Sequence, residues 1–274
     1  MWLVTGGADR VKGLTYWDKG WTSFEFALAM LIKPANTSTL KDWPQVVDLG
    51  KEGDAQTAFA RPALSEPLAF FGGHEYGDKT YTNGADRDAI VAPKFRETMF
   101  EVMGGVGELN FGKLKWGNAE IKALAVVLPL CGRLTKLQVH GNAFGDASMV
   151  ELAGAMGALD NLAVLHLLRN QITDDGFATL MPFLKKGGKL SNLTEFSIGS
   201  GITDKGMTEF ADILSMGALP ALEQLELTSN QIGDDGLSEL ASACASGALD
   251  HLTVCWRPTA LFPCLETWHT HPSD

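Results

Sequence analysis

The sequence predicts an α/β solenoid, in which repeated strand–helix units stack side by side along one axis. Three observations predict this fold. A strand-like segment recurs along the chain, a helix-like segment follows four of its copies, and a Gly-Ala-Leu loop follows three of those helices. The three features keep one period, so we expect each unit to pack on its neighbours and to bury a continuous apolar core.

The strand-like segment follows one template, with apolar residues at its first, fourth and sixth positions. Four copies fit it: LTKLQVHGNAF from Leu134, LAVLHLLRNQI from Leu162, LTEFSIGSGI from Leu193 and LEQLELTSNQI from Leu222. A weaker copy, VGELNFGKLKW, begins at Val106, and a broken copy, LTVCWR, begins at Leu252 and puts Arg257 where a buried residue is expected. Successive copies begin 28, 28, 31, 29 and 30 residues apart, which leaves room for a strand, a helix and two loops. We therefore expect about five units over residues 106–256, in an array that fails at the sixth.

Each unit is expected to carry a helix with one buried face, because apolar residues recur four positions apart after each strand. The pairs are Leu152 and Met156, Leu180 and Leu184, Phe210 and Leu214, and Leu240 and Cys244. An Asp or Thr ahead of each helix supplies an oxygen that can cap the free amides of the first turn. Capping also explains the paired acids, Asp174 with Asp175 and Asp234 with Asp235, better than a calcium site does, because the repeats add no further ligands.

Asparagine stands at the ninth position of three copies, as Asn142, Asn170 and Asn230. The template L-x-x-L-x-L-x-x-N-x-L resembles leucine-rich-repeat proteins of the ribonuclease-inhibitor-like type over residues 106–256. The resemblance implies a right-handed β-α superhelix shaped as a horseshoe, with a parallel concave sheet, convex helices and protein partners on the concave face. It also implies that these asparagines turn inward and bond backbone groups. The third copy is one residue shorter near Gly201, so its turn is expected to be looser.

Period-two alternation along each strand identifies the side chains that the repeat leaves free for binding a partner. They are Glu108, Asn110, Lys136, Gln138, His140, Val164, His166, Leu168, Glu195, Ser197, Gln224, Glu226 and Thr228. Val164, His166 and Leu168, with neighbouring Arg169, form a mixed apolar and basic patch, a composition found at the centres of interfaces. Ordinary surface variation explains this patch equally well, and both interpretations stay open.

Two groups of residues offer metal ligands, but neither has a familiar pattern. His140 and His166 are placed at equivalent positions of adjacent strands, roughly 5 Å apart in the pairing direction, and the repeat adds no third ligand. The tail residues Cys255, Cys264, His269 and His271 do not match the spacing of zinc sites. The sequence therefore predicts no metal and no cofactor.

Residues 1–105 lack the repeat, although the first apolar edge of the array needs a cap. We expect a helix from about Asp86 to Met103 to supply this cap, with a kink or restart at Pro93. Its apolar residues are Ile90, Phe95, Met99 and Val102. Residues 22–33 predict an earlier helix, residues 43–50 predict a short strand, and residues 257–274 predict an irregular tail.

Residues 16–26, YWDKGWTSFEF, resemble the W-C-x-x-E-L segment of TIR-like domains. The resemblance implies an NAD-cleaving enzyme with Glu25 as its catalytic glutamate. Thr22 replaces the usual Cys and Phe26 the usual Leu, and the 20 residues before Trp21 leave no room for the strands and loops that shape a nucleotide pocket. A carboxylate without that pocket has no bound substrate to act on.

The composition favours a noncatalytic binding protein. Hydrophobic residues make up 45% of the 274 residues, which is enough for a packed core, and no apolar run is long enough to span a bilayer. The net charge of -11 repels phosphate backbones, so neither nucleic acid nor a membrane is expected as a partner. The four scattered cysteines indicate reduced thiols and the cytoplasm. We expect a noncatalytic module that binds a protein partner. The alternatives are a TIR-like enzyme remnant and a fragment of a larger receptor or scaffold.

Overall fold

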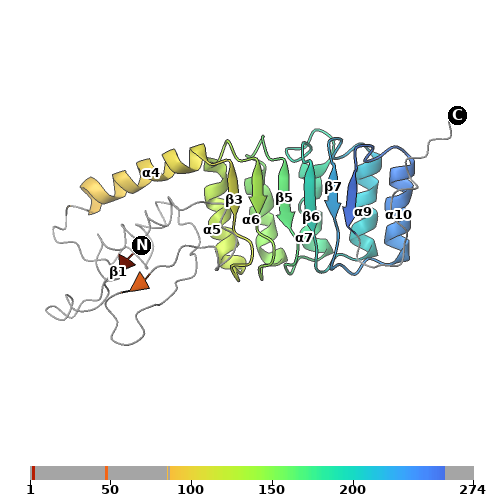
Figure 1. The fold of residues 1–274 in the computed structure, drawn as a ribbon, viewed down its shortest axis with the longest axis horizontal. Coiled ribbons are helices and arrows are strands. Elements are labelled where there is room, and N and C mark those ends of the chain that lie inside the picture. The colour runs from red at the N-terminus through yellow and green to blue at the C-terminus, as the bar shows by residue number, and fades with distance from the viewer. Residues whose placement is uncertain (1, 4–46, 49–84, 86, 257–274) are drawn as a thin grey trace.

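Six short strands form one parallel sheet in the order of the chain (Figure 1). The computed structural model describes residues 2–3, 47–48, 85 and 87–256, and the following statements concern these residues. The strands are β3 (Glu108–Asn110), β4 (Lys136–Gln138), β5 (Val164–Leu167), β6 (Glu195–Ile198), β7 (Gln224–Glu226) and β8 (Val254–Trp256). Because sequential strands pair as parallel neighbours, each connection must cross over the sheet, and a helix makes that crossing.

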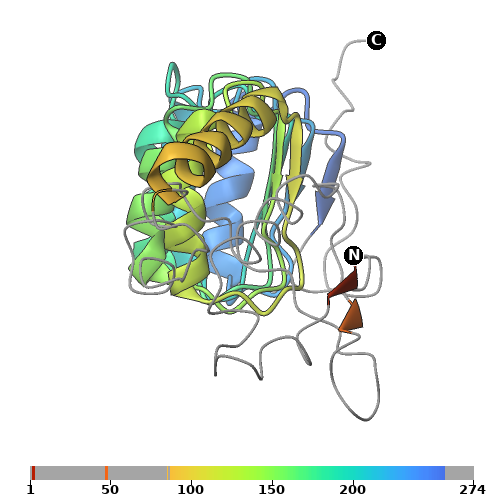
Figure 2. The same cartoon turned by 90° about the vertical axis from the view of Figure 1, so that its left-hand side faces the viewer.

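The helices lie on one side of the sheet, and the described part of the chain places none on the other side (Figure 2). They are α5 (Asn118–Val127) with the short 3-10 turn η4 (Leu128–Leu130), α6 (Asp146–Met156), α7 (Asp174–Ala178), α8 (Met181–Leu184), α9 (Asp204–Ser215) and α10 (Asp234–Ala245). The predicted α/β solenoid with a parallel sheet is therefore confirmed. It has five strand–helix units and then a sixth strand.

The core fills the space between the sheet and the helices. Leu137, Leu165, Phe196 and Leu225 stand in register on β4 to β7, and all four are buried. Phe196 also contacts two rings from the helical layer, Phe177 and Phe210, at centroid distances of 6.3 Å each. Burying a side chain of this size contributes roughly 1.5–3 kcal/mol, so this layer provides much of the stability of the array.

The helical layer is continuous in every unit except the third. There the predicted helix is divided into α7 and α8, which are separated by Thr179 and Leu180. Pro182 explains the division, because it has no amide hydrogen to bond the carbonyl of Ala178 and its ring crowds that carbonyl. Leu180 and Leu184 are nevertheless both buried, as their spacing predicted.

The predicted capping helix is present before the first strand. A π-helical turn, η3 (Arg87–Val91), precedes α4 (Ala92–Gly105), and Pro93 lies in the first turn of α4, as expected for a restart. The predicted buried face is wrong at Ile90, which is 51% exposed, whereas Val102 is partly buried and packs against the core. The helix instead buries residues spaced four apart, namely Val91, Phe95, Met99 and Met103.

Two further predictions concern the ends of the chain. The segment LTVCWR contributes a strand, β8, which pairs with β7 and extends the sheet through Trp256. At the other end, β2 (Val47–Asp48) agrees with the strand expected within residues 43–50 and pairs with β1 (Trp2–Leu3). The helix predicted at residues 22–33, Arg257 and the tail lie outside the described residues.

Candidate functional site

The ninth-position asparagines bind the unit before them, as predicted. Asn142 accepts hydrogen bonds from the amides of Leu114 and Trp116 and donates to the carbonyls of Phe111 and Val139. Asn230 makes the same pattern near the other end of the array, where it accepts hydrogen bonds from the amides of Ser200 and Ile202. These side chains fasten each turn to the next unit and are therefore engaged in the fold rather than free for binding.

The shortened copy that begins at Leu193 has no asparagine at the ninth position, and a backbone carbonyl supplies the missing hydrogen-bond acceptor. The carbonyl of Gly199 accepts the amide of Asn170 at 3.3 Å, where an asparagine side chain would otherwise serve. The turn around Gly201 is in turn held by Asn230, which accepts from both Ser200 and Ile202. The missing residue therefore leaves the turn hydrogen-bonded to both of its neighbours.

The acids at the helix starts form a second ladder between units, which corrects the prediction that they cap their own helices. The predicted threonine cap is confirmed at Thr203, whose hydroxyl accepts the amide of Lys205 in α9. Asp174 accepts from the backbone amide and the hydroxyl of Thr203, which precedes the next helix. Asp146 does the same with Thr173, and Asp204 accepts from the amides of Gly233 and Gly236. Each carboxylate thus satisfies free amides of the following helix, where the helix dipole also favours a negative charge.

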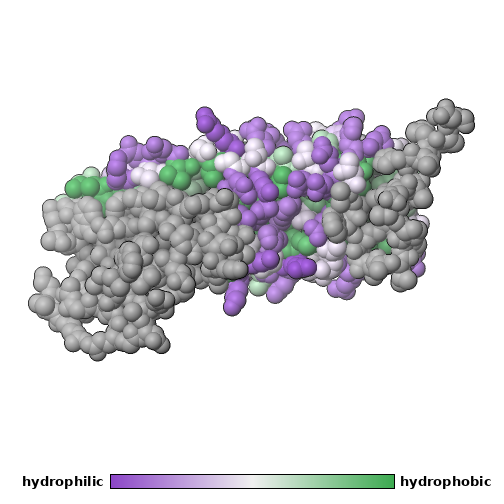
Figure 3. Space-filling view, in the orientation of Figure 1, coloured by the Kyte–Doolittle hydropathy of each residue, from purple (hydrophilic) through white to green (hydrophobic). Residues whose placement is uncertain are grey.

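These two ladders leave one extended surface without a structural role, the face of the β3–β8 sheet turned away from the helices, which we call the open face. Its residues stand in rows across the strands. One row runs Glu108, Lys136, Val164, Glu195, Gln224, and the next runs Asn110, Gln138, His166, Ser197, Glu226. Over β4 to β6 this surface is mainly hydrophilic (Figure 3).

Most of the residues predicted for binding are accessible on the open face, but three are not. Leu168 is 7% exposed, Ser197 is 3% exposed and Asn110 is also buried. Leu168 extends toward Gly199 on the next unit, where a Cβ atom would meet its side chain at 3.1 Å. The centre of the face is therefore more polar than predicted, because Val164 alone remains of the expected apolar component.

His166 lies at the centre of a polar network that spans three strands. Its Nδ1 atom is 3.1 Å from the Nε2 atom of Gln138 on β4, and its Nε2 atom is 3.4 Å from the Glu195 carboxylate on β6. Since the Gln138 amide donates, Nδ1 accepts, and the proton of a neutral ring is on Nε2, facing Glu195. Burial lowers the pKa of His166, against the opposing effect of Glu195, so the neutral ring is favoured.

His140 is not the strand neighbour of His166, which corrects the predicted pairing. The residue opposite His166 is Gln138. His140 lies two residues further along the chain, just after β4 and beside Leu168. Its Nδ1 atom is buried, and no group of the described residues is a hydrogen-bond partner for it. Burial lowers the pKa of His140, and nearby His166 and Lys113 lower it further.

Two cations bordering this face were missed by the analysis of the strands. Lys113 and Lys115 lie in the loop after β3, both are exposed, and both have a left-handed backbone with φ of 59° and 62°. The period of the repeat relates Lys113 to Arg169, because Lys113 is 28 residues before Gly141 and Gly141 is 28 residues before Arg169. Arg169, which was predicted, has the same backbone conformation, with φ of 56°.

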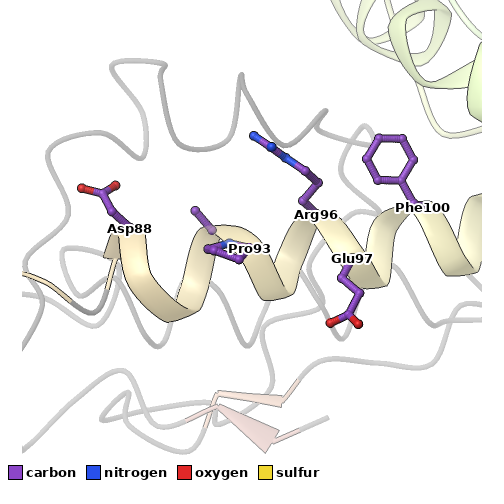
Figure 4. A pocket seen from close by; sticks show the side chains of 6 residues that line it. Asp88, Pro93, Arg96, Glu97 and Phe100 are labelled. Atoms are coloured by element: carbon purple, nitrogen blue, oxygen red, sulfur yellow. The ribbon is translucent and has the colours of Figure 1, made fainter.

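A separate cavity of about 430 Å³ lies along η3 and α4 and is lined by Asp88, Ala92, Pro93, Arg96, Glu97 and Phe100 (Figure 4). Its described lining comes from one continuous helical stretch. Glu97 is already paired with Lys94 at 2.7 Å. Polar groups from several elements do not converge here, as they do in most ligand sites, and the open face is therefore the better candidate.

The predictions about metal ligands, the catalytic glutamate and membrane-spanning segments can be compared only with the described residues. Within the described residues, no cluster of three or more His, Cys, Asp or Glu side chains could hold a metal ion. Glu25, Cys264, His269 and His271 lie outside that part of the chain, as does the side chain of Cys255. Among the described helices, none combines the length and apolar character needed to cross a membrane.

Comparison with known proteins supports the repeat assignment. The family model described as "Leucine Rich repeat" matches residues 219–241, which cover β7 and most of α10. The Tonsoku-like protein of Mus musculus is 28% identical over 147 residues, or 53% of this chain and 9% of that protein. The Tonsoku-like protein of Danio rerio is 27% identical over 128 residues, or 47% of this chain and 7% of that protein. The chain thus matches less than a tenth of the length of these relatives.

A solved structure of an internalin from Listeria monocytogenes is 15% identical and covers 81% of this chain and 63% of its own, with a TM-score of 0.33. That score is too low to add to the argument, which depends on the repeats themselves. The recurring strand template, the asparagine ladder and the family match on residues 219–241 agree with one another. The chain therefore contains a leucine-rich repeat at residues 219–241, and the same template recurs along the solenoid.

Proposed function

We propose that the chain is a noncatalytic protein-interaction module that binds a partner polypeptide on the open face of the β3–β8 sheet. The observation that carries the proposal is the alternation along each strand: every second residue is buried against the helices, and most of the others are accessible and take no part in either ladder. The accessible residues are Lys136, Gln138, His140, Val164, His166, Arg169, Glu195, Gln224, Glu226 and Thr228. Stacked repeats present such rows as one extended surface, which suits a protein partner.

The one arrangement on this face that resembles catalytic machinery supports the noncatalytic assignment. Ser197 stands opposite His166, and Glu195 contacts the ring, so the three residues have the types of a nucleophile, a base and an acid. A base in such a triad needs one ring nitrogen for the acid and the other for the nucleophile. In this protein Glu195 and Gln138 already contact the two nitrogens. Ser197 is also buried, so a substrate would not reach its hydroxyl.

Site-specific photo-crosslinking tests the location of binding. A photoreactive phenylalanine analogue is introduced at Lys136 or Gln224, on the open face, in the full chain. Matched controls carry it at Val150 or Met216, which are 65% and 73% exposed on helices or their ends. We expect partner polypeptides to be crosslinked from the open-face positions and not from the controls. Crosslinks from Val150 or Met216 alone, or equally from both sides, would show that the open face is not the binding surface.

A further inference from the structure

The loops after β3, β4 and β5 bring two cations to either side of one glycine. The amide of Lys113 donates to the carbonyl of His140 at 2.9 Å, and a Cβ atom on Gly141 would meet the Lys113 side chain at 3.0 Å. On the other side, Gly141 donates to the carbonyl of Leu168, the residue just before Arg169, at 2.8 Å. Lys113 and Arg169 therefore flank the end of β4, two strand spacings or roughly 10 Å apart.

The backbone at these positions favours glycine, yet two units carry long cationic side chains there. Gly141 has φ of 67°, and the equivalent residues Lys113 and Arg169 have φ of 59° and 56°. A residue with a Cβ atom is disfavoured in this left-handed region by roughly 1–2 kcal/mol. The repeat therefore tolerates strain at both of the positions that hold the cations, and strained positions often coincide with functional sites.

The cations also lack counter-charges in the part of the chain that the structure describes. Within these residues, no ion pair involves Lys113, Lys115, Lys136 or Arg169, although the whole chain has a net charge of -11. Lys113, Lys115 and Arg169 are exposed, and the His140 ring lies near both Lys113 and Arg169. One corner of the open face thus offers positive charge that no described carboxylate neutralises in an ion pair.

We propose that this corner of the open face, formed by Lys113, His140 and Arg169, binds an acidic segment of a partner polypeptide. The proposal rests on the proposed function and specifies the chemistry of the partner. The two cations pair with carboxylates of this segment, and His140, whose backbone carbonyl accepts the Lys113 amide, lies beside them. In a polyproline II segment, residues three apart lie on the same face and about 9 Å apart, which matches the spacing of the two cations.

A polypeptide fits this surface better than a nucleic acid does. Glu195 and Glu226 lie on the same face beside the histidines, and both are partly exposed. A continuous run of phosphates along the sheet would be repelled by these carboxylates. A peptide can place acidic residues over Lys113 and Arg169 and neutral or basic residues over Glu195 and Glu226, so its charges complement those of the face.

Fluorescence anisotropy with a defined probe tests the proposal on the full chain. The probe is a fluorescein-labelled peptide in which glutamate occupies every third position between serine and glycine, and its control replaces each glutamate by glutamine. We expect saturable binding of the acidic probe that weakens with added salt. The double variant Lys113→Glu/Arg169→Glu should weaken this binding at least about 10-fold, because both carboxylate partners are reversed.

A matched variant separates a local effect from a change in net charge. Lys185→Glu/Lys186→Glu changes the charge by the same amount in the exposed segment that directly follows α8, in the helical layer. This variant should keep the dissociation constant within about 2-fold. An equal loss in both double variants, or equal binding of the glutamine peptide, would overturn the proposal. So would an oligothymidylate of the same charge that binds more tightly than the acidic peptide through the same two cations.

The two proposals fail in different experiments. If the acidic peptide does not bind while crosslinks from Lys136 or Gln224 persist, only the assignment of an acidic partner is wrong. If those crosslinks are absent, the open face is not the interaction surface. A thermal melt of each variant, expected to match that of the unmodified chain, confirms that the exposed substitutions leave the fold intact.

Discussion

The imidazole of His166 lies 3.4 Å from the carboxylate of Glu195 on the neighbouring strand, and Gln138 contacts the ring from the other side. The contact crosses the centre of the open face and links three successive units. Because the ring is largely buried between these strands, its protonation state affects both the fold and the surface offered to a partner.

The histidines of the open face are predicted to make stability depend on pH. Burial lowers the pKa values of His140 and His166 below the ordinary 6.5, so in this range the unfolded chain binds more protons than the folded chain. The free energy of unfolding should therefore fall as the pH drops from above 6.5 toward the lowered pKa values. We expect His140→Gln/His166→Gln to flatten this dependence in chemical denaturation measured between pH 7.5 and 5. A slope equally steep in the double variant would refute this assignment.

The asparagine ladder is predicted to be a large contributor to stability. Asn170 is 4% exposed, donates to the carbonyls of Val139 and Leu167, and accepts the amide of Asn142. Asn170→Ala removes all three bonds, although the Val139 carbonyl keeps its bond from Asn142, so it should lower the free energy of unfolding by roughly 2–4 kcal/mol. Urea titration measures the change. Asn161→Ala removes one exposed bond to Gly132 and should cost less than about 1 kcal/mol; equal losses would contradict the ladder.

The acid ladder predicts different roles for two adjacent aspartates. Asp174 holds the backbone and hydroxyl of Thr203 in the next unit, whereas Asp175 makes an exposed contact of 3.7 Å with Lys205. Asp174→Ala should therefore destabilise the protein by about 1–3 kcal/mol, and Asp175→Ala by no more than about 0.5 kcal/mol. Thermal melts of the two variants provide the comparison. A larger effect at Asp175 would mean that the acids act as a pair, for example by capping their own helix.

The packing of the third and fourth units is predicted to depend on the ring of Phe196. This side chain is fully buried between Phe177 and Phe210, so Phe196→Ala should destabilise the fold by about 3–5 kcal/mol through lost contacts and a cavity. Met216→Ala, at a side chain that is 73% exposed, should change the free energy of unfolding by less than about 0.5 kcal/mol. Denaturant titration of both variants checks the difference, and similar stabilities would contradict the predicted core.

The sequence by itself determined the solenoid, its period and its buried strand positions. Residues such as Leu165 and Phe196 recur in one template, and a strand buries alternate side chains wherever it lies in the sheet. The inward asparagines were implied by the resemblance to leucine-rich-repeat proteins. Local patterns of this kind are visible in the sequence because each unit repeats the same physical requirement.

Only the tertiary structure decided how the units meet and which side chains remain accessible. The pairing of His166 with Gln138 rather than His140, the burial of Leu168 and Ser197, and the bond from Asp174 to Thr203 all join units about 30 residues apart. Contacts between Lys113, Gly141 and Leu168 depend on the register of three neighbouring loops. Register and turn geometry are set by the packing of whole units against one another, so a template read along one unit does not contain them.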